Sequence, residues 1–131
     1  MTLLGACSED PTEPVPDVAG DWTFADSVTA SFGTCTAAGT VTFSQSGRTL
    51  GGVIDATEGI CVWADGGSDD NSGPVDISGG NVSRTTVSFT AGVCEFTSTT
   101  VTDVRIDGDE FCTLNTGTQT FVLRGVFSLQ R

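Results

Sequence analysis

The chain has 131 residues, which suits one domain with a short flanking segment, and its 17 acidic residues against five basic ones give a formal net charge of −12. Such a charge repels phosphate backbones, so no nucleic-acid partner is expected. The chain contains no histidine, tyrosine or lysine, which excludes serine–histidine triads, histidine-bound zinc and Schiff-base catalysis. We therefore predict a protein that is not an enzyme and needs no cofactor.

A short motif near the N-terminus indicates a lipid anchor. Leu4-Gly5-Ala6-Cys7 resembles the lipobox of bacterial lipoproteins, in which an aliphatic residue and two small residues precede the acylated cysteine. The resemblance implies that residues 1–6 are the remnant of a signal peptide and that Cys7 is the lipidation site, which would hold the protein on a membrane. Ser8 implies anchoring in the outer membrane of a bacterial cell envelope, facing the periplasm or the exterior. Without lipidation, the protein would be secreted.

Residues 7–19 have the composition of a tether. The stretch from Ser8 to Asp17 contains three of the chain's four prolines and four acidic residues, with no apolar periodicity. Such a segment cannot offset its ordering entropy by burial, so we expect it to be extended and mobile. The folded domain is expected over residues 20–131.

From residue 20 onward, apolar and polar residues alternate in short runs separated by turn residues, and no window shows a helical period. The runs occupy residues 21–28, 39–45, 48–55, 59–64, 75–78, 81–90, 93–106, 110–114 and 118–130. This pattern predicts an all-β protein, a single antiparallel meander that closes into an eight- or nine-stranded barrel. A β-sandwich is the alternative.

Glycine pairs mark the expected turns and bends of this meander. Turns are predicted at Ser46-Gly47, Gly79-Gly80 and Ala91-Gly92, and most strongly at Asp107-Gly108, since both residues tolerate a primed hairpin turn. We therefore interpret Asp107, Asp109 and Glu110 as turn residues. Gly51-Gly52 and Gly125 lie within strand patterns, where they predict bulges or bends.

Four further cysteines lie in the β region and are widely spaced. Without a CxxC pair or a histidine they do not form a zinc motif, so two disulfides in an oxidising compartment are predicted. Four cysteines allow three pairings. We favour Cys35–Cys61 and Cys94–Cys112, because each pair would join neighbouring strands within its own half of the meander.

Gly20-Asp21-Trp22 resembles the G-x-W motif that opens the first strand of lipocalins. The resemblance implies a lipocalin-like barrel in which the tryptophan closes one end beneath an arginine of the last strand, here Arg124 or Arg131. It also implies an interior site for one small apolar ligand. The alternative is a barrel filled by its own side chains. The residues expected to line the pocket or fill the core are Trp22, Phe24, Val41, Phe43, Trp63, Phe89, Phe121 and Leu123.

The loop from Asp65 to Pro74 carries hard oxygen ligands at Asp65, Asp69 and Asp70, which makes it a candidate calcium site. It does not follow the EF-hand spacing, so a solvated loop without metal is the prediction.

These patterns predict a lipid-tethered barrel that holds a small apolar ligand. The alternative is a structural or interaction protein, a subunit of an extracellular assembly, that binds a protein partner by pairing strands through its N-terminal arm or exposed sheet edges. A secreted hydrolase is the third hypothesis, and no nucleophile–base pair supports it.

Overall fold

The computed structural model describes residues 14–131, so the lipobox-like motif, Cys7 and most of the predicted tether lie outside the described residues. The described part is all-β, and none of its segments is a helix long and apolar enough to cross a membrane. Its strands are β1 (Gly20–Ala30), β2 (Gly33–Ser46), β3 (Thr49–Trp63), β4 (Ser68–Asp70), β5 (Gly73–Val82), β6 (Val87–Ala91), β7 (Cys94–Val101), β8 (Arg105–Asn115) and β9 (Thr120–Gln130).

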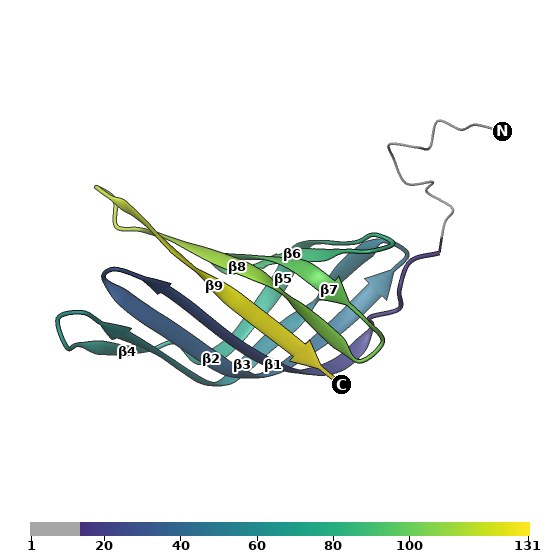
Figure 1. The fold of residues 1–131 in the computed structure, drawn as a ribbon, viewed down its shortest axis with the longest axis horizontal. Helices are drawn as coiled ribbons and strands as arrows, with labels where there is room; N and C mark the ends of the chain where they lie inside the picture. Colours follow the sequence, from purple (N-terminus) through teal and green to yellow (C-terminus); the bar gives the residue numbers. More distant parts are fainter. Residues whose placement is uncertain (1–13) are drawn as a thin grey trace.

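Eight of these strands form a closed antiparallel barrel (Figure 1), as the sequence predicted. Each barrel strand pairs with the next one along the chain, β9 pairs with β1, and the β2–β3 ladder completes the circle. The short strand β4 lies outside this circle and pairs with the last residues of β3. The sandwich alternative is therefore wrong.

The barrel forms because inward and outward residues alternate along each strand. On β1, for example, Trp22, Phe24 and Val28 are buried while Thr23 and Ala25 are exposed. Inward rows of this kind meet in an aromatic core, whose rings lie 4.7–6.3 Å apart between centroids. The rings belong to Phe24, Phe43, Phe89, Phe96 and Phe127.

One end of the barrel is closed by Trp22 and Arg131. The Arg131 guanidinium lies 4.2 Å from the centroid of the buried Trp22 ring, so the arginine that stacks on the indole is the last residue of the chain. Arg131 also donates hydrogen bonds to the carbonyl oxygens of Asp17, Ala19 and Asp103. The guanidinium thereby ties the segment before β1 and the β7–β8 turn to the same ring.

The folded domain begins before Gly20. Val18 is only 1% exposed, and its carbonyl accepts a hydrogen bond from Trp22 Nε1. The Gln45 side chain holds the same segment, since it accepts from Val18 N–H and donates to the carbonyl of Pro16. Residues 16–19, which the composition assigns to the tether, are therefore packed on the closed end.

Two predicted turns are wrong. Asp107-Gly108 lies inside β8 and Gly79-Gly80 lies inside β5, at an irregularity of the β5–β6 ladder. The actual turns use hydroxyl side chains instead of glycine: Ser83 Oγ accepts from Thr86 N–H, and Thr102 Oγ1 accepts from Arg105 N–H. Glu110 is accordingly an interior strand residue, and the interpretation of Asp107, Asp109 and Glu110 as turn residues is also wrong.

Two other turn predictions and one bulge prediction are confirmed. Turns follow Ser46 and Ala91, as predicted, and the β3–β5 ladder shifts register between Leu50 and Gly52. At Gly125 the register is unbroken. A Cβ there would lie 1.7 Å from the carbonyl oxygen of Ser27, so this glycine allows the β1 backbone to approach β9 closely.

Candidate ligand cavity

The half of the barrel away from Trp22 contains a cavity of about 310 Å³. Its wall is mainly apolar and is built from inward residues of most barrel strands, including Phe24 and Val28 of β1, Ile54 of β3, Phe96 of β7 and Leu123 of β9. The volume lies at the lower end of the roughly 300–1,000 Å³ that is typical of sites for small molecules. Within the described part of the chain, the barrel is thus filled by side chains at one end and hollow at the other.

The cavity reaches the surface where the wall is short. Beyond Gly73, the edge of β3 is covered by β4, but the β5–β6 ladder starts only at Ile77 and Ala91, so the first residues of β5 have no β6 neighbour. The β6–β7 turn ends at a similar height, whereas β8 and β9 run on past it (Figure 1). Val75 and Val93 stand at this rim and are 38% and 56% exposed. A ligand therefore has an apolar entrance.

Two disulfides brace the cavity on opposite sides. Cys35–Cys61 joins β2 to β3, and Cys94–Cys112 joins β7 to β8, which confirms the predicted pairing. In the strand order, these two pairs lie across the barrel from each other. All four cysteines line the cavity. The cross-links thus hold the two walls of the hollow half, where packed side chains do not.

The polar feature of the cavity is a pair of acidic side chains, Asp26 on β1 and Glu110 on β8. They project inward from strands that are separated only by β9. The β9 residue directly opposite Glu110 is Gly125. Because glycine has no side chain, it leaves room for the two carboxyl groups to meet across β9.

The environment of the pair favours a shared proton. Burial, the hydrogen bond with Asp26 and its charge raise the pKa of Glu110 to about 10. Burial also raises the pKa of Asp26, although hydrogen bonds with Glu110 and with the backbone of Ala37 oppose this effect. At neutral pH, Glu110 is therefore neutral and the pair carries at most one negative charge, on Asp26.

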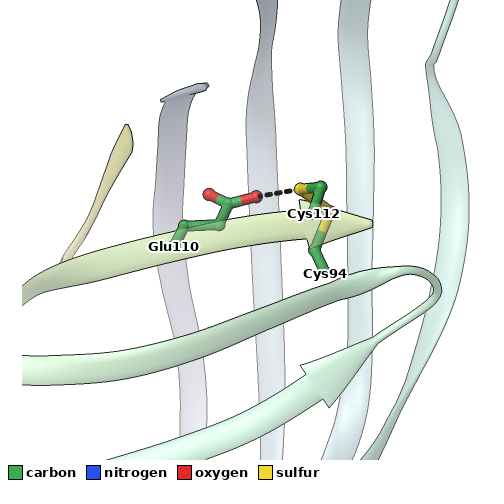
Figure 2. A group of neighbouring side chains, drawn as sticks. All are labelled: Cys94, Glu110 and Cys112. Atoms are coloured by element: carbon green, nitrogen blue, oxygen red, sulfur yellow. Dashed lines mark hydrogen bonds between the residues drawn. A yellow bond between two sulfur atoms is a disulfide. The ribbon is translucent and has the colours of Figure 1, made fainter. Parts of the chain in front are cut away.

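A disulfide sulfur also lies beside Glu110 and offers its carboxyl group no proton. Cys112 Sγ lies 3.4 Å from Glu110 Oε2 (Figure 2). Because this sulfur belongs to a disulfide it carries no hydrogen, so the carboxyl must be the donor in any hydrogen bond between them. The other carboxyl oxygen, Oε1, is buried and has no partner outside the acid pair.

The same three side chains do not form a metal site. Cys94, Glu110 and Cys112 bring potential ligand atoms within 4.8 Å of one another, and theirs is the one such group found in residues 14–131. Both sulfurs are consumed by the disulfide, and metal binding requires thiolates. The cluster is therefore a disulfide beside a neutral acid.

The residues expected in the pocket or core lie in the cavity wall, at the open end of the barrel and in its aromatic half. Phe24, Trp63 and Leu123 line the cavity. Phe121 lies beyond them at the open end, where its ring is 5.0 Å from that of Phe32. The remaining four fill the aromatic half of the barrel: Trp22, Val41, Phe43 and Phe89.

The three acids of the predicted loop, of which Asp69 and Asp70 lie in β4, each accept a hydrogen bond from a nearby residue. Asp69 Oδ2 accepts a hydrogen bond from Trp63 Nε1 at 2.7 Å, Asp70 Oδ1 accepts two from Ser72, and Asp65 Oδ1 accepts one from Gly67 N–H. The three carboxylates are not among the groups that could jointly hold an ion in the described chain. Their positions therefore fit loop stabilisation, with Asp69 orienting the cavity residue Trp63.

The sequence interpretation missed the acid pair. Both residues occupy inward positions of an alternating row, Trp22-Phe24-Asp26-Val28 and Ile106-Gly108-Glu110-Cys112. That alternation was the signal that could have found them, because a charged residue in an inward row must lie inside the barrel. The hairpin dipeptide Asp107-Gly108 obscured it.

The cavity therefore combines an apolar wall, an apolar rim and one acidic spot. Such a surface can exclude water from a small apolar molecule and can also accept or donate a hydrogen bond at one point. No protein-family model, no curated protein and no solved structure matches this chain.

Proposed function

We propose that this protein is a non-enzymatic binding protein of the bacterial cell envelope, tethered by lipid at Cys7, whose barrel holds one small and mainly apolar ligand. The observation that carries the proposal is the open cavity of about 310 Å³ with its apolar lining. Packed protein interiors contain few voids larger than a water molecule, so a hollow of this size is unusual in a barrel core.

The construction of the cavity wall favours binding over catalysis. The lining offers no hydroxyl or free thiol among its side chains, and its two acids share a proton instead of flanking a nucleophile. The disulfides keep the hollow half in shape before any ligand arrives, and a preformed site lowers the entropy lost on binding.

A closed barrel also favours this function over assembly by strand pairing. In residues 14–131 each of the eight barrel strands has neighbours on both sides, so only β4 and the strand ends beyond their partners offer free backbone groups. A protein partner that adds a strand would find little edge to pair with.

Filling the cavity tests the binding function. Ala56 is a buried lining residue, so Ala56→Phe should occupy the volume that a ligand needs. Ala25→Phe makes the same change on the exposed outer face of β1 and serves as the matched control. We expect wild type and Ala25→Phe to enhance the fluorescence of an uncharged apolar dye such as pyrene with saturable binding, and Ala56→Phe to weaken that binding at least tenfold. Equal binding by all three proteins would place the dye elsewhere and contradict the proposal.

The lipid anchor has a separate test. In bacterial cells that express the chain behind a lipoprotein signal, we expect the intact mass of the purified protein to include acyl chains on Cys7. Cys7→Ser should remove that mass and release the protein from the membrane fraction. An unmodified thiol at Cys7 in membrane-free protein would contradict the anchor and leave the cavity proposal standing.

A further inference from the structure

The Asp26–Glu110 pair is costly for a cavity that binds only hydrocarbon. A buried carboxylate loses its hydration, and this loss is recovered only through partners that stabilise the charge. Glu110 is 3% exposed, and its Oε1 is buried without a partner outside the pair. The polar neighbours that the described residues give this buried acid are Asp26 and the Cys94–Cys112 disulfide, and neither carries a positive charge.

No cation of the described chain lines this cavity. Apart from the disulfide cysteines, Asp26 and Glu110 are the only titratable residues in its wall, and Asn71 at the rim is the other polar side chain. Arg105 pairs with Asp107 on the outer face, Arg124 lies over the ring of Phe111, and Arg131 closes the opposite end. A positive partner for the pair would therefore come from outside the cavity wall.

We propose that the ligand is an apolar molecule with a single protonated amine, whose ammonium group donates hydrogen bonds to Asp26 and Glu110 while its apolar body lies against the cavity wall. This inference rests on the proposed ligand-binding function and names the chemical class of the ligand. Two facts of position carry it: the acid pair lies inside the apolar cavity, and the rest of the lining is free of charge.

The charges of ligand and site balance. The pair carries at most one negative charge at neutral pH, on Asp26, so one ammonium group is enough to neutralise it. An alcohol could donate a single hydrogen bond but would leave the carboxylate charge uncompensated, and an acid would be repelled. The formal net charge of −12 also raises the local concentration of organic cations around the protein.

The place of the pair in the barrel sets the orientation of the ligand. Glu110 lies directly opposite Phe96, and Asp26 follows Phe24 in the same inward row. The rings of Phe24 and Phe96 are packed edge to face beneath the cavity. The ammonium therefore binds deep, beside the aromatic core, and the apolar body extends toward Val75 and Val93 at the rim.

Calorimetric titration with matched ligands tests the amine. The probes are phenethylamine, hexylamine and octylamine, each paired with the alcohol of the same carbon skeleton. Wild type should bind at least one amine tenfold or more tighter than its alcohol. Asp26→Asn should lose that preference while it still binds the alcohol, and Glu110→Gln should reduce it. Asp109→Asn removes an acid from the exposed face beside Glu110 and should change neither affinity.

The outcomes separate this inference from the function on which it rests. If every amine binds no tighter than its alcohol, or if Asp26→Asn keeps the full preference, the amine assignment is overturned although the cavity still binds ligands. If Asp109→Asn weakens amine binding as much as Asp26→Asn does, the preference reflects net charge and the assignment also fails. If none of the amines, the alcohols or pyrene binds, the binding function itself fails.

Discussion

At the scale of single residues, the most informative feature is the position of two acids inside an otherwise apolar barrel. Asp26 and Glu110 meet across Gly125, so the side chain missing from β9 is what makes room for the pair. A buried acid pair is tolerable only when it shares a proton or receives a cation. The same two residues therefore affect both stability and ligand choice.

The pH dependence of stability follows from Glu110. In the folded protein the pKa of Glu110 is raised to about 10, whereas in the unfolded chain this carboxyl group has the ordinary value of 4.5. Between these values the folded state binds more protons, so the free energy of unfolding is highest below pH 4.5 and falls as the pH rises toward 10. Glu110→Gln cannot ionise and should be more stable than wild type by roughly 2 kcal/mol or more at pH 8, with little difference at pH 4.5.

Urea unfolding of both proteins at the two pH values measures this effect. Asp109→Asn, on the exposed face of the same strand, is the control and should not change the pH profile in this way. If the free energies of unfolding of wild type and Glu110→Gln differ by the same amount at pH 4.5 and at pH 8, Glu110 ionises in the folded protein as it does in the unfolded chain.

Arg131 is the second residue with a specific prediction. Its stacking on Trp22 and its hydrogen bonds to three carbonyl oxygens should make Arg131→Ala less stable by about 1–2 kcal/mol in thermal or urea unfolding. Arg124→Ala removes an arginine from an exposed contact 5.6 Å from the centroid of Phe111 and should cost less than about 0.5 kcal/mol. Equal losses of stability in the two variants would show that the contact of Arg131 with Trp22 stabilises the fold no more than the exposed contact of Arg124 does.

At the scale of strands and turns, the sequence predicts an element well where burial determines which residues face inward. It predicts a turn poorly where local side-chain hydrogen bonds form that turn. Alternation predicted the last strand, because Leu123, Phe127 and Leu129 all lie on one buried face. It missed residues 33–38 of β2, where Thr, Ala and Gly give little contrast between the two faces. Turns built by Ser83 and Thr102 were missed because hydroxyl groups signal a turn less strongly than glycine does.

Within β9, Gly125 should be intolerant of substitution. A Cβ would lie 1.7 Å from Ser27 O and 2.7 Å from Val28 Cα, both backbone atoms that cannot move without shifting β1. We expect Gly125→Ala to lose at least about 3 kcal/mol or to fail to fold. At Gly51 the nearest atom is the flexible Ser44 Oγ at 3.3 Å, so Gly51→Ala should change stability by less than about 1 kcal/mol. Similar melting temperatures for the two variants would contradict the close approach of β1 and β9.

The disulfides should stabilise the barrel through the loops they close. Replacing both cysteines of either pair by alanine should lower the free energy of unfolding by roughly 3 kcal/mol, since the paired residues are 26 and 18 positions apart. Cys7→Ser is the matched control, because the four cysteines of the barrel pair with one another, and it should leave stability unchanged. A negligible effect of both double replacements would indicate that the walls hold the cavity without cross-links.

At the scale of the whole molecule, the closure of the barrel and the cavity inside it have different origins in the sequence. Closure was predictable, because a meander of alternating strands of this number removes its edges by joining the first strand to the last. The hollow was not predictable, because it depends on how long β5 to β7 are relative to β8 and β9 and on which inward residues are small. Ala37, Ala56 and Ala91 line the cavity, whereas phenylalanines fill the opposite half.

Native mass spectrometry of the protein, purified gently from the cells that produce it, tests most directly whether the hollow half of the barrel is a ligand site. We expect a population of wild type that carries one small molecule per chain, and we expect Ala25→Phe to retain this molecule and Ala56→Phe to lack it. Wild type that shows only the mass of the bare chain, or a bound molecule that Ala56→Phe keeps, would contradict a ligand site there.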